Sequence, residues 1–256
     1  MTAAAVSLVL AVCVFGGSLL AMSAARALPD SHLGSEARDV IKLGMGLVAT
    51  LVALVLGLMI ATAKGVYDAQ SAGVRQLAGN VLLLDRTLAE YGPETQHARG
   101  LLRQSAELML HRLWPAGGSA PASLAPGESG AQMNEFLREV TGLPAQNETQ
   151  RFLKAEALKL VADLAQARFQ MYVQGSSELP LPFLVVVVVW LSILFAGYGL
   201  VAARNATVMI FLFACTLSVA GAVFLIQELA TPFQGVVRVS SLPLRDVIAQ
   251  LDHTAP

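Results

Sequence analysis

The feature that most constrains this chain is an uncharged apolar run at residues 43–63, which passes without a break into a polar stretch. At 1.5 Å per residue, a helix of this length crosses a hydrocarbon core of about 30 Å. Residues 64–91 are mixed polar and are expected to lie in water. One continuous helix over residues 43–91 would be roughly 74 Å long and would join the membrane part to the aqueous part.

Small or polar residues recur on one side of this stretch at helical spacing. With 100° between successive residues, they fall within an arc of about 80°. They are Gly46, Thr50, Ala53, Gly57, Ala61, Lys64, Asp68, Ser71 and Arg75. Bulky apolar residues, from Val48 and Val52 to Leu84 and Leu88, occupy the opposite side. Both faces keep their phase past the membrane exit, which favours one helix; Gly65 is where a kink would interrupt it.

The composition places the chain in a bilayer. Hydrophobic residues make up 55% of it and charged residues 14%, with a mean hydropathy of +0.61, beyond what a soluble domain needs. The net charge of -1 offers no basic field for nucleic acid. Cys13 and Cys215 lie in apolar stretches, where a free thiol behaves as a small hydrophobe. The sequence thus predicts an integral membrane protein with no nucleic-acid partner.

Four apolar segments have the length of membrane spans, at residues 3–25, 43–63, 181–203 and 206–227. A secretory signal peptide is the alternative for the first, since Ala25-Arg26-Ala27 resembles a cleavage site. No Lys or Arg precedes this segment, and it is longer than a usual signal-peptide core, so we favour a retained span.

The remaining pattern is helical, which gives an all-α fold. Gly92-Pro93 predicts the turn of a helical hairpin, and Asn147 with Gln150 matches a capping box that opens a further helix. The predicted organisation is a transmembrane hairpin over residues 1–63, a helical aqueous domain over 64–178 with a flexible loop at 115–131, a second transmembrane hairpin over 179–228, and a C-terminal tail over 229–256.

Four spans put both termini and the domain at 64–178 on one side of the membrane. Basic residues near the spans number five on that side and four on the other. The two sets are Lys64, Arg75, Arg168, Arg238 and Arg245, against Arg26, Arg38, Lys42 and Arg204. This near balance gives little guidance from the positive-inside rule, and we expect the domain in the cytoplasm of a bacterial inner membrane.

No arrangement of residues suggests catalysis or a cofactor, so we do not expect an enzyme. His97 and His111 could share a helix face, but no carboxylate or cysteine stands beside them at ligand spacing, which favours solvated histidines. The acidic cluster of Asp30, His32, Glu36 and Asp39 matches no calcium loop and is better explained by helix capping. We therefore predict no metal site.

The spans contain no ionisable residue away from their ends, which disfavours a proton pump or coupled transporter. Two interpretations of the small stripe on the second span remain open. One is close packing of another helix, since small residues let backbones approach. The other is a narrow, uncharged pore wall made by Thr50, Ala53, Gly57 and Ala61.

The run LVATLVALVLGLMIATAKGVYDAQSAGVRQLAGNVLLLDRTLAEYGPE at residues 47–94 closely resembles a bacterial membrane family described as bestrophin-like. The segments LPDSHLGSEARDV and PFQGVVRVSSLPLRD resemble the same family. The similarity implies relatedness to bestrophins, which are pentameric anion channels with two spans, a cytosolic helical region and two further spans. In that family the second span lines the pore neck, which would correspond here to Thr50, Gly57 and Ala61.

Two features depart from the bestrophin pattern. Bestrophins carry bulky apolar residues at the neck, whereas this stripe is small, so a hydrophobic gate of that type is not carried over. The tail residues Pro232 and Phe233, followed by Leu242-Pro243-Leu244, resemble a stretch after the last bestrophin span. The acidic residues usual between them are missing, so a calcium clasp is not carried over either.

These observations lead to the hypothesis of a homo-oligomeric channel, a pentamer by analogy, for small chloride-like anions in the lipid bilayer. Lys64 and Arg75 would concentrate anions at the pore mouth, and Asp68 would partly offset them. The alternative from another class is a non-conducting scaffold or sensor that relays through the long second helix. Proton-driven stator units share the order of spans, but they need a partner carboxylate that nothing here identifies.

Overall fold

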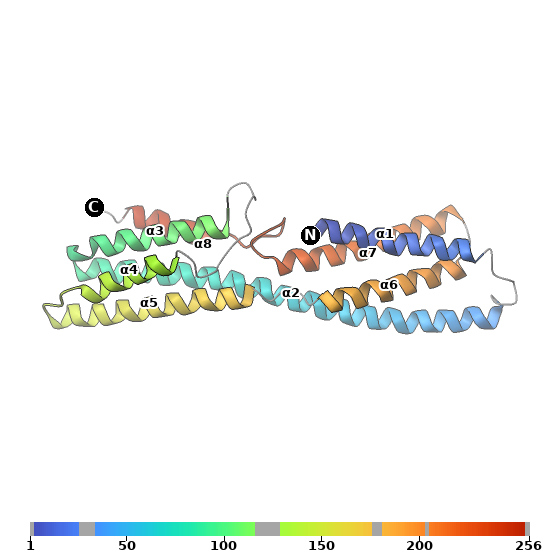
Figure 1. Ribbon diagram of the computed structural model, residues 1–256, viewed down its shortest axis with the longest axis horizontal. Helices are drawn as coiled ribbons and strands as arrows, with labels where there is room; N and C mark the ends of the chain where they lie inside the picture. The colour runs from blue at the N-terminus through green and yellow to red at the C-terminus, as the bar shows by residue number, and fades with distance from the viewer. Residues whose placement is uncertain (1–2, 26–33, 116–128, 176–180, 203–204, 254–256) are drawn as a thin grey trace. The chain divides into compact units, whose positions relative to one another are not determined.

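The computed structural model describes residues 3–25, 34–115, 129–175, 181–202 and 205–253. Its described part contains helices and no strand, which confirms the all-α fold (Figure 1). The elements are α1 (Ala3–Ala24), α2 (Ser35–Tyr91), the short 3-10 helix η2 (Pro93–Thr95), α3 (Gln96–Leu113), α4 (Ser129–Gly142), α5 (Glu148–Gly175), α6 (Leu181–Val201), α7 (Ala206–Ala230) and α8 (Leu242–His253). Four of them, α1, α2, α6 and α7, are long and apolar enough to span a membrane, as the sequence predicts.

The chain divides into two compact units, and the boundary falls inside α2 at Gly65. The membrane unit comprises residues 1–65 and 178–230, and the aqueous unit comprises residues 66–177 and 231–256. Helix α2 is continuous over 57 residues, so the kink considered at Gly65 does not interrupt the helix. The segment 231–256, predicted as a tail, belongs to the aqueous unit and contains α8, which the sequence analysis missed.

In the membrane unit, α1 packs against α6 and α7. The approach is closest at Gly199 of α6, where an added Cβ would collide with the backbone of α1 at Ser18. Gly197, one half-turn away, leaves room for the side chain of Met45 on α2. Small residues therefore let the backbones of these helices approach closely. In a bilayer, van der Waals packing of this kind drives helix association, because lipid offers no hydrophobic effect between helices.

The aqueous unit is held by an apolar core drawn from α2, α3, α4, α5 and α8. The predicted hairpin turn is present, with Gly92 at a φ of 138° that only glycine adopts readily. One half of the predicted capping box is present, since Gln150 donates its backbone N–H to Oδ1 of Asn147 over 2.7 Å; Oε1 of Gln150 accepts from the backbone N–H of Gln146 over 2.9 Å, and not from that of Asn147. At the end of α4, Lys154 donates to the carbonyls of Thr141 and Leu143 and so satisfies its last turn.

Candidate functional site

The small stripe of α2 is uncovered in the chain. Thr50, Ala53, Gly57 and Ala61 are all exposed. An added Cβ at Gly57 would meet no atom within 4 Å, so no packing partner in the described chain explains this glycine. The described residues of α1 and α7 thus do not bury the stripe.

The opposite face of α2 is buried in the same chain. Val52 and Met59 are each 5% exposed and belong to the core of the membrane unit, while Leu84 and Leu88 belong to the core of the aqueous unit. The two faces assigned from helical phase therefore have different environments, bulky side chains inside and small ones outside. Among the described residues, none buries the stripe.

A second exposed strip runs beside the small one. It consists of the large side chains Leu47, Leu51, Leu54 and Leu58, which are between 38% and 77% exposed together with Leu43. Side chains of this size suit lipid or a neighbouring helix. The two strips occupy adjacent arcs of α2 and are both uncharged, and they differ in the size of their side chains.

The hydroxyl groups on this part of α2 bond to their own helix. Thr50 donates to the carbonyl oxygen of Gly46 over 3.0 Å, and Thr62 donates to that of Leu58 over 2.9 Å. This pattern satisfies the hydroxyl hydrogen locally. The Thr50 oxygen can then only accept further hydrogen bonds, so the stripe offers no side-chain donor to an anion.

The charged residues predicted at the pore mouth continue the exposed face of α2. Lys64, Asp68 and Arg75 are all exposed. Arg75 donates to the hydroxyl oxygen of Ser71 over 2.9 Å, which orients its guanidinium along the helix. The three side chains carry two positive charges and one negative charge, so their balance is positive.

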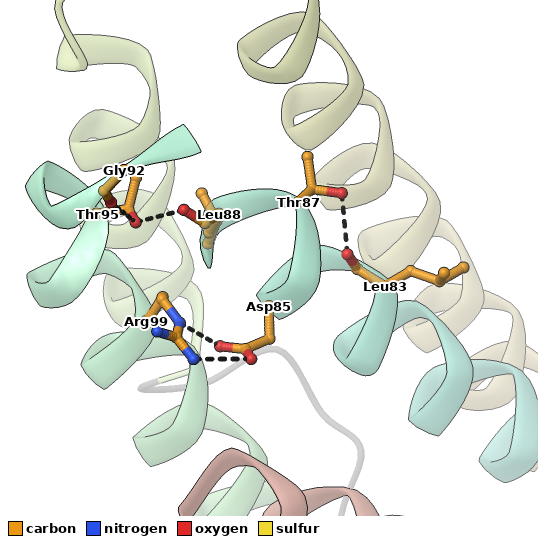
Figure 2. A network of polar contacts seen from close by, with 7 residues as sticks. All are labelled: Leu83, Asp85, Thr87, Leu88, Gly92, Thr95 and Arg99. Carbon is orange, nitrogen blue, oxygen red and sulfur yellow. Dashed lines mark hydrogen bonds and ion pairs between the residues drawn. The ribbon is translucent and has the colours of Figure 1, made fainter. Parts of the chain in front are cut away.

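A buried ion pair in the aqueous unit escaped the sequence analysis. Arg99 of α3 donates from Nε and Nη2 to the two carboxylate oxygens of Asp85 on α2, over 2.7 and 3.0 Å (Figure 2). The side chains are 15% and 5% exposed, respectively. Hydrogen bonding to Asp85 raises the pKa of Arg99, although burial opposes it. The pair clamps α2 to α3.

The signal for this pair was present in the sequence. Asp85 and Arg99 each lie seven residues from Gly92, and residues at equal distance from a helical turn face each other across the hairpin. Thr95 closes the same turn, with its hydroxyl 2.5 and 2.8 Å from the carbonyl oxygens of Leu88 and Gly92 (Figure 2). These contacts join α2 to α3 beside the turn between them, so we assign them a structural role.

The tail motif is also structural. Pro232 is buried, and the ring of Phe233 packs edge-on against Trp114 at a centroid distance of 5.5 Å. The indole of Trp114 donates to the carbonyl of Val239 over 2.9 Å, and the N–H of Val239 donates to the carbonyl of Pro232 over 2.7 Å. The motif therefore anchors the segment after α7 to the end of α3.

The structure does not gather the candidate metal ligands into one site among the residues that it describes. Within the described residues, no group of three or more His, Cys, Asp or Glu side chains could hold an ion. His97 and His111 are both exposed on α3, in agreement with solvated histidines. Asp30 and His32 lie outside the described residues.

Glu228, one residue beyond the predicted fourth span, is 5% exposed in the last turn of α7.

Comparison with known proteins shows one family and one fold. A family model described as a bestrophin-like domain matches residues 12–244. A variant of a bacterial bestrophin homologue from Klebsiella pneumoniae is 13% identical, with a TM-score of 0.67 and 96% of each chain covered. A second variant of that homologue is 15% identical, with a TM-score of 0.63 over 98% of this chain and 99% of that one. A structure described as a membrane protein variant is 12% identical, with a TM-score of 0.67 over 98% and 99%. No curated protein matches the chain.

Proposed function

Because the chain belongs to the bestrophin-like domain family, we propose that it forms a homo-oligomeric membrane channel for small anions, with α2 lining the pore. Its membrane part, its fold and its family are those of bestrophin homologues. Channel activity and anion preference come to this chain through the resemblance to bestrophins. The pentamer is proposed on the same ground.

One observation carries the assignment of α2 to the pore. The stripe of Thr50, Ala53, Gly57 and Ala61 is exposed in the chain, although the bulky face of the same helix is buried. A ring of α2 helices with this stripe inward would make a narrow wall of small side chains. In such a wall, backbone and methyl groups face the ion path rather than bulky rings.

The charges at the aqueous end of the stripe support an anion preference. Lys64 and Arg75 outweigh Asp68, and symmetry repeats this surplus in every subunit around the axis. Charges of one sign around a mouth raise the local concentration of the opposite ion. Selectivity would then arise at the mouth, since the Thr50 hydroxyl is already engaged with Gly46.

We place the protein in the bacterial inner membrane, with the aqueous unit in the cytoplasm and no enzymatic activity. The orientation follows the bestrophin arrangement, in which the helical region between spans two and three is cytosolic. A thiol-reactive, membrane-impermeant probe on a cysteine introduced at exposed Gln104 of α3, in a chain without Cys13 and Cys215, checks it in intact cells. The probe is expected to label only after the membrane is broken.

Ion flux in liposomes tests the proposal. The purified protein should conduct an anion gradient, and Gly57→Leu should reduce the flux at least severalfold because a leucine in every subunit would fill the wall. Gly44→Leu is the matched control. Gly44 is also an exposed glycine of α2 with no atom within 4 Å of an added Cβ, but it lies outside the arc of the stripe.

Two results would defeat the proposal. The first is wild-type protein that is correctly folded and conducts nothing, which would favour the scaffold or sensor. The second is equal flux in both leucine variants, which would remove α2 from the pore wall even if the protein conducts.

A further inference from the structure

Helix α5 presents an unusual exposed face for a helix outside the membrane spans. Phe152 is 68% exposed and Phe169 is 64% exposed. They belong to a row spaced alternately by three and four residues, which is the spacing of a helix seam. This α5 face consists of Phe152, Ala155, Lys159, Ala162, Gln166, Phe169 and Val173, all exposed.

The described residues leave this face uncovered, and its Phe152 end lies far along α5 from the next membrane span. Phe152 lies 23 residues before Gly175, the end of α5 nearest the next span, which is about 35 Å along a helix. Lipid does not reach that far from the bilayer. Residues 116–128, whose placement is not described, have the sequence AGGSAPASLAPGE and contain Leu124 as their one large apolar residue. That sequence is too poor in apolar groups to bury two phenylalanines.

A second uncovered row lies on α2 in the same aqueous unit. It also alternates between steps of four and three residues. This α2 face consists of Ala72, Gln76, Gly79, Leu83, Arg86 and Glu90, all exposed. Two of its members are small, and an added Cβ at Gly79 would meet no atom within 4 Å. One face thus carries large rings and the other has room for them.

Two hydrogen bonds set the levels of α2 and α5 relative to each other. Gln70 donates from Nε2 to the carbonyl of Met171 over 2.8 Å, and Gln150 donates from Nε2 to the carbonyl of Tyr91 over 3.3 Å. Both bonds join residues whose numbers add to 241. The helices therefore run antiparallel without slippage over this stretch, and any pair adding to 241 lies at one level.

We infer that the α5 face of one subunit packs on the α2 face of the next subunit, an inference that rests on the proposed oligomer with α2 helices around its axis. A rotation about an axis parallel to the helices moves no residue along them, so the levels carry over between subunits. The faces differ, so the contact is head-to-tail, the kind that closes a ring.

The level rule gives one match in size and one match in charge between the two faces. It sets Phe169 over Ala72, a large ring over a small side chain, and Ala162 over Gly79. It also sets Arg151 at the level of Glu90, so that opposite charges meet at the far end. Among the described residues of one chain, Arg151 forms an ion pair with Glu148 of its own helix, and both side chains stay more than half exposed, at 64% and 88%. An exposed ion pair at the edge of an interface fixes how the two helices align along their length more than it strengthens the binding between subunits.

Disulfide formation between singly substituted chains tests the contact. A full-length chain carrying Ala72→Cys is co-expressed with a longer-tagged chain carrying Phe169→Cys, both without the free thiols Cys13 and Cys215. Because each chain has one cysteine, a disulfide between the two sizes can only join different subunits. The matched control replaces Phe169→Cys by Ala155→Cys, at another exposed position of the α5 face. Ala155 lies at the level of residue 86, and residue 86 is about 21 Å from Ala72 along α2.

Mild oxidation should give a mixed-size crosslinked band that is several-fold stronger for the Ala72→Cys and Phe169→Cys pair than for the control pair. The mass of the uncrosslinked particle is measured on the same samples. An intact oligomer with no mixed band, or with equal bands from both pairs, overturns the inference and leaves the proposed channel standing. A monomeric particle overturns both.

Discussion

At the scale of single residues, the aqueous unit depends on polar contacts that an apolar pattern does not reveal. Asp85 and Arg99 join α2 to α3 through two hydrogen bonds, and both side chains are largely buried from solvent. A buried ion pair stabilises a fold little more than apolar residues of similar volume would. Removing one partner, however, leaves the other charge buried without a counter-charge. The pair also fixes the end of α2 next to the turn that leads into α3.

Arg99→Ala should therefore lower the free energy of unfolding by on the order of 3 kcal/mol, because Asp85 would remain buried without its counter-charge. Thermal unfolding of the detergent-solubilised protein measures it. Arg103→Ala is the control, since Arg103 lies one turn further along α3 and its pairs with Glu107 and Asp252 are about 40% exposed. The control should change the unfolding temperature much less; equal losses would show that Asp85 is not dependent on Arg99.

At the scale of elements, the close approach of α1 and α6 depends on one glycine. Gly199→Val should destabilise the membrane unit because its Cβ would collide with the α1 backbone at Ser18. Gly221→Val on α7 is the matched control, as an added Cβ there meets no atom within 4 Å. The yield of monodisperse protein after extraction and its unfolding temperature should both drop for Gly199→Val alone. If the two valine variants behave alike, the approach at Gly199 is not required.

The sequence predicts the long elements well because their signals are long. Four apolar runs define the spans, and a phase shared over 49 residues, from 43 to 91, predicts the continuous helix α2. The burial of the bulky face of α2 was also predicted from that phase, as at Val52, whereas the phase left open whether the small face meets another helix or water; Thr50 on that face is exposed. Helical periodicity carries this information directly, since side chains one turn apart share an environment.

Short elements and contacts between distant residues were predicted less well. Helix α8 was taken as part of a tail, although Leu244, Val247, Ile248 and Leu251 follow helical spacing and are all buried. Pro243 is compatible with this helix, because a proline is tolerated in the first turn of a helix. The bond between Trp114 and Val239 spans 125 residues, a separation over which no local pattern carries information.

At the scale of the whole molecule, three faces are exposed in the described part of the chain, and the proposed ring would account for all three. In the membrane unit the small stripe of α2 is open, and in the aqueous unit the α5 face and the α2 face are open. A ring would bring the stripes to its axis and the other two faces together between neighbours. One assembly thus accounts for features at different places along α2.

The central claim is that a ring of subunits places the small stripe of α2 around a path through the membrane. An electron-microscopy reconstruction of the purified particle in lipid nanodiscs tests it most directly, because it reports the number of subunits and the residues nearest the axis together. The account predicts a closed ring, a pentamer by analogy, with Thr50, Ala53, Gly57 and Ala61 lining the axis. A monomer or dimer, or a ring in which another helix covers this stripe, would contradict it.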